Sequence, residues 1–467
     1  MNRILIKLIC AALLAGGMNL RAEVRPSCLF SEGGVLQQGV PVPIWGTAKD
    51  GETVTVSFQG QSVTTTAQDG YWMVALQPLQ AGGPFTMVIA GDNQITLNNV
   101  LVGEVWLCSG QSNMGLSLYK TANAKEAIAA AADPQLRFFT VPRKTANVPL
   151  FDTRGNWKNS SPKSAAVFSA VAYYFGRDLR QARQVPIGLI HASVAGTSIV
   201  AWNSRATAEG DPKSRLLLGR HVQMAAALNS ANTASSGTNV MRPECLYNGM
   251  IAPLQPFAMA GVIWYQGEAD VLQTTQYRTR FPELIGNWRL AWGRGDFPFL
   301  FVQAAPWAGT PPTLREAQLL TWETVPDTAM VVTTDVGDRS RIHPLRKEPV
   351  GARLVLAARA MAYGEPIEYS GPVYNSLTMD GDHAILSFTH TGSGLVAQGG
   401  VLKGFTIAGD NGRFFKAVAE IAGNTVIVSS PAVPNPVAVR YGWSNVPDVN
   451  LFNQEGLPAT PFRTDVK

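Results

Sequence analysis

The strongest chemical signal in the sequence is a serine placed directly after a buried strand. Residues 102–107 have the pattern of a buried strand, and the small and polar segment 108–113, which contains Ser112, follows at once. A serine on a tight turn at a strand end can act as a nucleophile, because the turn lifts its Oγ from the sheet and neighbouring amides can face a developing oxyanion. The alternative interpretation is that Ser112 only caps a helix.

A nucleophilic serine needs a base, and the chain has only five histidines. His343 is favoured, because it lies in a loop after the predicted strand 329–334, with Asp335 and Asp338 nearby. His191 also stands at the end of a predicted strand and is the second candidate. For either residue the alternative is a hydrogen-bonded structural imidazole.

Residues 100–365 show the alternation of strands and helices that is typical of an α/β domain. Buried strands are predicted at 185–190, 261–265, 299–303 and 329–334, and helices at 168–179, 277–292, 314–322 and 348–361. In an open parallel sheet, ligands bind at the carboxyl ends of the strands. The loops that follow the strands are therefore expected to carry the site.

Two β-rich regions are expected to flank this domain. Residues 23–99 consist of short alternating segments separated by turn signals, which predicts a β-sandwich-like domain. Residues 366–467 return to the same alternation and form a second β-rich region. Residues 203–245 interrupt the α/β pattern with a polar stretch and are interpreted as a surface insertion.

Composition limits the classes of protein that the chain can be. Its 467 residues are 46% hydrophobic and 15% charged, which excludes a disordered chain, a coiled coil and collagen. Three of its 38 basic residues lie in the first 22, and the remaining 35 nearly balance the 33 acidic residues. No basic run with interleaved aromatic residues occurs, so nucleic acid is not expected as a partner.

The N-terminus has the pattern of a secretory signal peptide. Arg3 and Lys7 flank the start of an apolar run at 8–15, and small residues lead to a cleavage point after Ala22. The apolar run is too short to span a bilayer. We therefore predict that residues 1–22 are removed, that the mature chain has no membrane span, and that it is exported to the periplasm or beyond.

No cofactor is predicted for this chain. The expected mature chain keeps Cys28, Cys108 and Cys245, which lack the spacing of a disulfide framework or of a metal site. No pair of histidines or cysteines has metal-ligand spacing either. The sequence carries no signal for an oligomeric state.

Three segments in this order carry a family resemblance: WLCSGQSNM at 106–114, WYQGEAD at 264–270 and IHP at 342–344. They resemble the sialate O-acetylesterase family of SGNH-type hydrolases, which includes bacterial acetylxylan esterases. The likeness extends over most of the mature chain. It implies an open, mostly parallel sheet with helices on both faces.

The resemblance also implies roles for individual residues. Ser112 would accept the acyl group and His343 would be its general base. The oxyanion would be met by the Ser112 amide, by Gly196 and by the side-chain amide of Gln266, where such enzymes generally have an asparagine. Two further roles are implied, an alternative oxyanion donor for Asn113 and loop orientation or substrate hydroxyl binding for Glu268.

The third member of a triad is the least defined by the sequence. SGNH hydrolases commonly place an aspartate three residues before the catalytic histidine, but Ser340 stands there in this chain. Asp335 and Asp338 are the acids within reach, and Asp338 is favoured because it shares the loop of His343. A Ser–His dyad remains an alternative.

The sequence thus predicts an exported carbohydrate O-acetylesterase that acts on sialic acid or plant-type glycans through an acetyl-serine. The alternative is a catalytically inactive carbohydrate-binding or scaffolding protein, since 11 Trp and 11 Tyr could stack on sugar rings. A lipase-like esterase for apolar acyl chains is disfavoured, because no G-x-S-x-G elbow surrounds Ser112. Ser112 and His343 together favour catalysis over binding alone.

Overall fold

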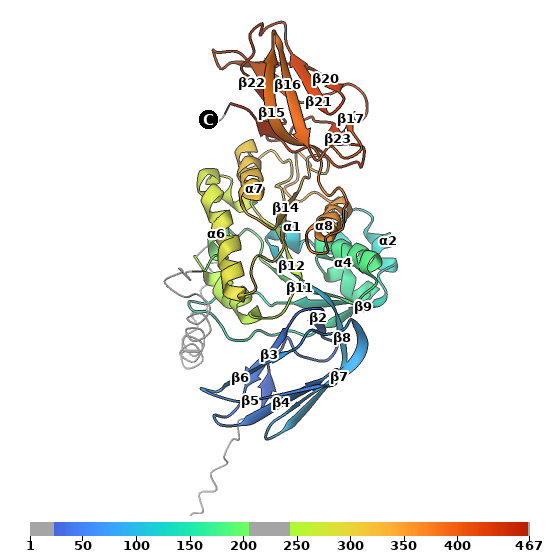
Figure 1. Ribbon diagram of the computed structural model, residues 1–467, viewed down its shortest axis with the longest axis vertical. Helices are drawn as coiled ribbons and strands as arrows, with labels where there is room; N and C mark the ends of the chain where they lie inside the picture. Colours follow the sequence, from blue (N-terminus) through green and yellow to red (C-terminus); the bar gives the residue numbers. More distant parts are fainter. Residues whose placement is uncertain (1–22, 205–242, 466–467) are drawn as a thin grey trace, which may run out of the picture.

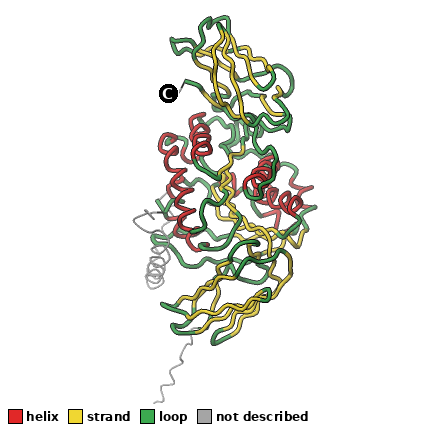
Figure 2. Tube along the Cα trace, viewed as in Figure 1, coloured by secondary structure: helices red, strands yellow, loops and turns green. Residues whose placement is uncertain are grey.

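The structure is a computed structural model that describes residues 23–204 and 243–465. The expected leader and most of the expected insertion at 203–245 lie outside the described residues. Figure 1 shows three parts in succession along the long axis: an N-terminal β region, a central α/β part and a C-terminal β region. Figure 2 shows that the helices gather in the central part. The chain therefore has the mixed α/β architecture that the sequence predicts.

The N-terminal region is built mainly from antiparallel strands, in two layers on a shared apolar core. In β4, Val54, Val56 and Phe58 are buried, whereas the residues between them are more exposed, so the strand has one apolar face. One sheet has the order β1-β3-β6, and in the other β4 pairs with β5 and β7. The strands are β1 (Arg25–Pro26), β2 (Val35–Gln37), β3 (Val42–Thr47), β4 (Thr53–Phe58), β5 (Gln61–Thr66), β6 (Tyr71–Leu76) and β7 (Gly82–Ala90).

One long strand, β8 (Gln94–Gly110), connects this region to the central sheet. Its first part pairs antiparallel with β7, and its last part lies between β11 and β12, parallel to both. The domain boundary expected between residues 99 and 100 thus falls inside a continuous strand. Because β8 belongs to both units, the N-terminal region is joined rigidly to the strand that carries the expected nucleophile.

The central sheet has the strand order β10-β9-β11-β8-β12-β13-β14. All neighbouring pairs are parallel except β9 with β10. The chain adds β11 on one side of β8 and β12 on the other, so the direction of winding reverses at β8, and ligands bind at such switch points. The strands are β9 (Asp133–Thr140), β10 (Lys158–Ser160), β11 (Ile187–Ser193), β12 (Gly261–Tyr265), β13 (Phe299–Val302) and β14 (Thr328–Val331).

Helices cover both faces of the sheet (Figure 1). Val262 and Trp264 of β12 belong to one core with α6 and α7, whereas Ile263 and Tyr265 belong to the other core with α4 and α8. This division follows from the alternation of side chains along a strand. The helices are α1 (Ser112–Gly115), α2 (Ala124–Ala129), α3 (Pro162–Val167), α4 (Ala170–Arg183), α6 (Thr274–Trp292), α7 (Pro312–Thr324) and α8 (Glu348–Met361).

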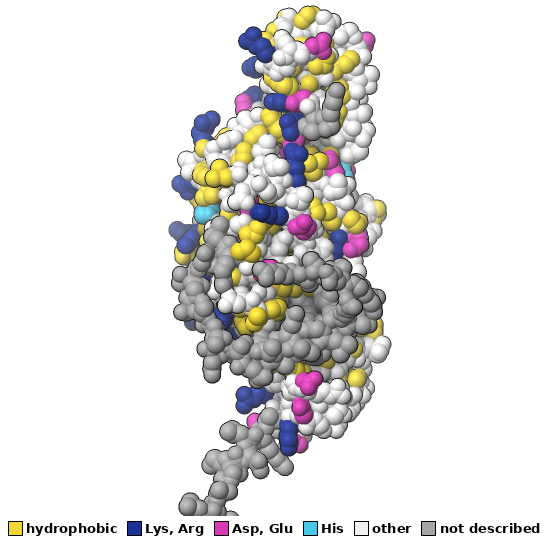
Figure 3. Space-filling model, turned by 90° about the vertical axis from the view of Figure 1, so that its left-hand side faces the viewer, with side chains coloured by type: hydrophobic (Ala, Val, Ile, Leu, Met, Phe, Trp, Pro, Cys, Tyr) yellow, Lys and Arg dark blue, Asp and Glu magenta, His cyan; other side chains and the backbone are white. Residues whose placement is uncertain are grey.

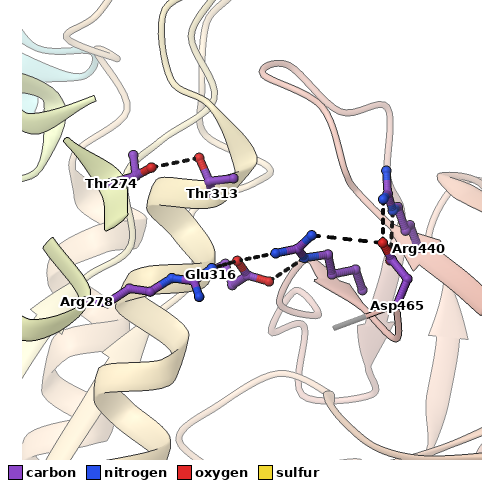
Figure 4. Close-up of polar contacts among 7 residues, drawn as sticks. Thr274, Arg278, Thr313, Glu316, Arg440 and Asp465 are labelled. Atoms are coloured by element: carbon purple, nitrogen blue, oxygen red, sulfur yellow. Dashed lines mark hydrogen bonds and ion pairs between the residues drawn. The ribbon is translucent and has the colours of Figure 1, made fainter. Parts of the chain in front are cut away.

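The C-terminal region has its own apolar core under two four-stranded sheets and one two-stranded sheet. Glu316 of α7 binds Arg463 through both carboxylate oxygens, at 2.7 and 3.0 Å, and also binds Arg278 of α6 (Figure 4). This ion-pair group joins the region to the central part. The strands are β15 (Val373–Asp380), β16 (His383–Thr389), β17 (Leu395–Ala397), β18 (Phe405–Ala408), β19 (Phe414–Lys416), β20 (Val418–Ala422), β21 (Thr425–Ser429), β22 (Ala438–Tyr441), β23 (Leu451–Asn453) and β24 (Phe462–Arg463).

Charged side chains of both signs are interspersed on the face shown in Figure 3, and they form no single basic surface there. Among the described residues, no helix combines the length and the apolar character that crossing a membrane requires.

Candidate active site

Ser112 lies at the carboxyl end of the central strand, where the sequence predicted it. It is the first residue of the short helix α1 and is partly exposed. Gly110 makes the turn possible, since its φ is +131° and a Cβ there would lie 2.2 Å from the Tyr265 carbonyl oxygen. Only glycine fits such a backbone so close to the neighbouring strand. The Oγ of Ser112 lies 3.5 Å from Nε2 of Gln111.

His343 lies in the loop between β14 and α8 and is also partly exposed. A hydrogen bond connects the residue after Ser112 with the residue before His343. Nδ2 of Asn113 donates to the Ile342 carbonyl oxygen at 3.0 Å. The structure thus joins the immediate neighbours of Ser112 and His343. No hydrogen bond joins the side chains of Ser112 and His343 in the structure, and catalytic hydrogen bonds often tighten only when substrate is bound.

The environment of His343 disfavours the protonated form of its imidazole. Partial burial, and then the positive charge of Lys347, lower the pKa of His343 below its usual value. A cation and a loss of water both disfavour the imidazolium form. A neutral imidazole is the form that can accept the proton of a serine hydroxyl.

Neither expected acid touches the imidazole of His343 in this structure. Asp335 forms a bidentate pair with Arg353, with both N–O distances at 2.7 Å. Asp338 accepts hydrogen bonds from the amide and hydroxyl of Ser340, at 2.8 and 2.7 Å, which lowers the pKa of its exposed carboxyl. The prediction that one of them orients the histidine therefore finds no support in these contacts, because other partners occupy the carboxylates.

Gly196 lies in the loop after β11, at a φ of +67°, and is exposed. Asp270 fixes this loop, because its carboxylate accepts hydrogen bonds from the Ser198 hydroxyl and, at 2.9 Å, from the Ile199 amide. Asp270 is buried and was not singled out by the sequence analysis, although it lies within segment 264–270. Its partners show that it shapes this loop.

Gln266 does not offer the oxyanion donor that the sequence predicted. Its side chain is fully buried, and Nε2 donates to the Thr197 carbonyl oxygen at 3.1 Å and to Asp270 at 2.5 Å. Its Oε1 accepts from the Tyr277 hydroxyl at 3.1 Å. Both donors of an amide side chain are thus engaged. Gln266 instead fastens the Gly196 loop to the end of β12.

Asn113 is likewise not a free donor, because Nδ2 binds both the Ile342 carbonyl and, at 2.5 Å, the Glu268 carboxylate. Its Oδ1 accepts a hydrogen bond from Nζ of Lys347 at 2.5 Å. Glu268 is buried and fits the predicted loop-orienting role through this contact. Lys347 was missed by the sequence analysis, since nothing in its type or spacing separates it from a surface lysine.

His191, the second candidate base, is bound within its own strand. Its Nε2 lies 2.7 Å from Oγ of Ser193, two residues along β11 on the same face. Burial lowers the pKa of His191 to about 4. The described residues contain no cluster of three or more His, Cys, Asp or Glu that could hold a metal ion.

Comparisons with known proteins identify the family of the chain. A family model described as carbohydrate esterase, sialic acid-specific acetylesterase, matches residues 102–355, more than half of the chain. Sialate O-acetylesterase of Mus musculus is 33% identical over 90% of this chain and 90% of its own length, and that of Homo sapiens is 31% identical over 90% and 88%. A crystal structure of a carbohydrate acetylesterase from Xanthomonas citri matches with a TM-score of 0.86 and 40% identity, covering 95% of this chain and 100% of that one. The chain is therefore an ester hydrolase and belongs to the family of sialic acid-specific carbohydrate acetylesterases.

Proposed function

We propose that the protein removes O-acetyl groups from carbohydrates through an acetyl-enzyme on Ser112. The observation that carries the proposal is the hydrogen bond from Asn113 to the Ile342 carbonyl, since it joins the neighbours of Ser112 and His343 at the carboxyl edge of the sheet. The names of the relatives, sialate O-acetylesterase and carbohydrate acetylesterase, indicate the class of substrate. The sheet with helices on both faces fits an SGNH-type hydrolase.

In the first half-reaction, Oγ of Ser112 attacks the acetyl carbonyl carbon while a neutral His343 takes the hydroxyl proton. The amides of Ser112 and Gly196 would stabilise the negative oxygen of the tetrahedral intermediate. The sugar oxygen then leaves with the proton from His343. In the second half-reaction water attacks the acetyl-serine with His343 as base, and acetate is released.

The experiment that tests the substrate class is a panel of acetylated sialic acid, acetylated xylan and acetylated gluco-oligosaccharides, with acetate release as the readout. We expect at least one glycan to be deacetylated and the Ser112→Ala variant to release no acetate from it. If aryl acetates are hydrolysed but no glycan is, the carbohydrate assignment is wrong. If glycans bind without losing acetate, the protein is a carbohydrate-binding protein instead.

We also propose that the chain is exported after removal of residues 1–22. This rests on the leader pattern around Arg3, Lys7 and the apolar run that follows. N-terminal sequencing of protein expressed with its own leader in a Gram-negative host should begin at Glu23. An unprocessed N-terminus in a protein that stays in the cytoplasm would contradict export.

A further inference from the structure

Asn113 connects three separate loops at the candidate active site. It is fully buried and follows Ser112 in α1. Its amide nitrogen binds Glu268 in the loop after β12 and the carbonyl oxygen of Ile342 in the histidine loop, while its oxygen faces Lys347 at the start of α8. Both donors of the Asn113 side chain and one of the two acceptor positions of its oxygen are therefore engaged.

The three partners of Asn113 agree on which way its amide points. An asparagine side chain has one acceptor oxygen and one nitrogen with two donors, whereas an ammonium group only donates. The Ile342 carbonyl and the Glu268 carboxylate accept, so the nitrogen of Asn113 faces them, and Lys347 supplies the donor for the oxygen. Without this lysine the buried oxygen of Asn113 would lose its donor, and the contact between the nucleophile turn and the histidine loop would be held less firmly.

Lys347 is only 1% exposed, which is rare for a lysine. From β12 the ring centroid of Tyr265 lies 4.9 Å from Nζ, and from the following loop Glu268 supplies a negative charge. The negative charge of Asp270 contributes to raising the pKa of Glu268. From its own loop His343 faces it. On α8 the neighbouring Glu348 is paired with Arg177 of α4. Burial lowers the pKa of Lys347 to about 7, and Glu268 opposes that shift.

We propose that Lys347 is a positioning residue of this hydrolase. By binding Asn113, it keeps the nucleophile turn and the histidine loop in their relative positions. The inference rests on the proposed function, in which Ser112 is the nucleophile and His343 the base. Lys347 touches no reacting atom in this account. When protonated, Lys347 also acts on His343, because a nearby cation disfavours the imidazolium form.

The test compares Lys347→Met, which removes the charge and the donor at similar length, with Lys347→Arg, which keeps both. Arg346→Met is the control, because the Arg346 side chain is exposed and only donates to the Asp335 carbonyl oxygen. For Lys347→Met we expect kcat on a soluble aryl acetate to fall by roughly 10- to 100-fold, as for other misplaced catalytic groups. KM should change little, and the acid limb of the kcat/KM profile should move to higher pH.

Lys347→Arg should keep the acid limb near its parental position and recover part of kcat, and Arg346→Met should match the parent. A folded Lys347→Met variant with parental kcat and an unmoved acid limb would overturn the proposal. If Lys347→Met does not fold, Lys347→Gln carries the test, because it is also neutral. An unmoved acid limb in that variant likewise overturns the proposal.

A fluorophosphonate probe separates this inference from the proposed function. The probe phosphonylates an activated serine with loss of fluoride, and the labelled residue is found by peptide mass spectrometry. If Ser112 of the parent is not labelled, the proposed function is wrong. If Ser112 is labelled in the parent and at the same rate in Lys347→Met, only the inference about Lys347 is wrong.

Discussion

The amide side chains of Gln266 and Asn113, near Ser112, have no N–H donor left for a developing oxyanion. Each of them uses both side-chain N–H donors on protein partners. Backbone amides at Ser112 and Gly196 remain as candidates. An oxyanion site built from backbone groups needs no side-chain rearrangement during the reaction, which favours preorganised stabilisation.

The two acids before His343 give the first prediction at this scale. Asp335→Asn should lower the free energy of unfolding by about 1–3 kcal/mol, because it weakens a partly buried bidentate pair with Arg353. Asp338→Asn is the matched control and should leave stability almost unchanged, since its carboxyl is exposed. Both should keep kcat within a few-fold of the parent. A large fall in kcat for one variant, with its fold intact, would identify that aspartate as the third member of a triad.

The pH dependence of the reaction is the second prediction. Because the pKa of His343 is lowered, the base stays neutral to a more acidic pH than an ordinary histidine would. The acid limb of the kcat/KM profile, which reports the free enzyme, should therefore lie below the usual histidine pKa of about 6.5. Steady-state rates on an aryl acetate across the acid range measure it. An acid limb above that value would mean that His343 is not the base or is not desolvated.

At the scale of elements, the turn between β8 and α1 depends on Gly110. Gly110→Ala would place a Cβ 2.2 Å from the Tyr265 carbonyl oxygen at a φ of +131°. We expect the unfolding free energy to fall by more than about 1 kcal/mol, because the turn must move away from β12 to make room for the methyl group. We expect kcat to fall as well, because Ser112 moves with the turn. Gly286→Ala on α6 is the control, because open space surrounds that position. Alanine there should raise the unfolding free energy by about 0.5–1 kcal/mol and leave kcat unchanged.

Thermal unfolding and turnover of both glycine variants decide this point. If Gly110→Ala unfolds at the parental temperature with parental kcat, the turn does not position Ser112.

The elements were predictable where local pattern decides structure. The strand at 261–265 and the helix at 348–361 match β12 and α8 at both ends, because their apolar spacing matches their burial. The contacts within the site were not predictable. The pairing of Asp335 with Arg353 and of Lys347 with Asn113 depends on how loops distant in sequence meet, and residue type and spacing carry no information about that.

At the scale of the whole molecule, the C-terminal region buttresses the loop after β13. Arg315 of α7 is fully buried and donates to the carbonyl oxygens of Ser444 and Asn445, at 3.0 and 2.6 Å. The side chain of Asn445 donates to the Ala308 carbonyl, and the amide of Ala308 donates to Arg339 in the histidine loop. A continuous chain of contacts therefore leads from the C-terminal region to the loop of His343.

Arg315→Met tests this connection. The loss of buried donors leaves carbonyl groups without partners, and we expect a cost of about 3 kcal/mol in unfolding free energy together with a lower kcat. Arg413→Met, an exposed arginine of the C-terminal region, should change neither. Calorimetry and steady-state kinetics on both variants measure the difference. A destabilised Arg315→Met with parental kcat would show that the C-terminal region stabilises the fold without supporting the site.

The central claim is that the reaction passes through an acetyl group on Ser112. Rapid acid quenching of the enzyme during turnover of an aryl acetate, followed by peptide mass spectrometry, tests it most directly. We predict one added acetyl group on the peptide that contains Ser112, none in Ser112→Ala, and a fall in kcat of at least ~10³-fold in that variant. An enzyme that turns over with no acetylated serine, or a Ser112→Ala variant with parental kcat, would contradict the account.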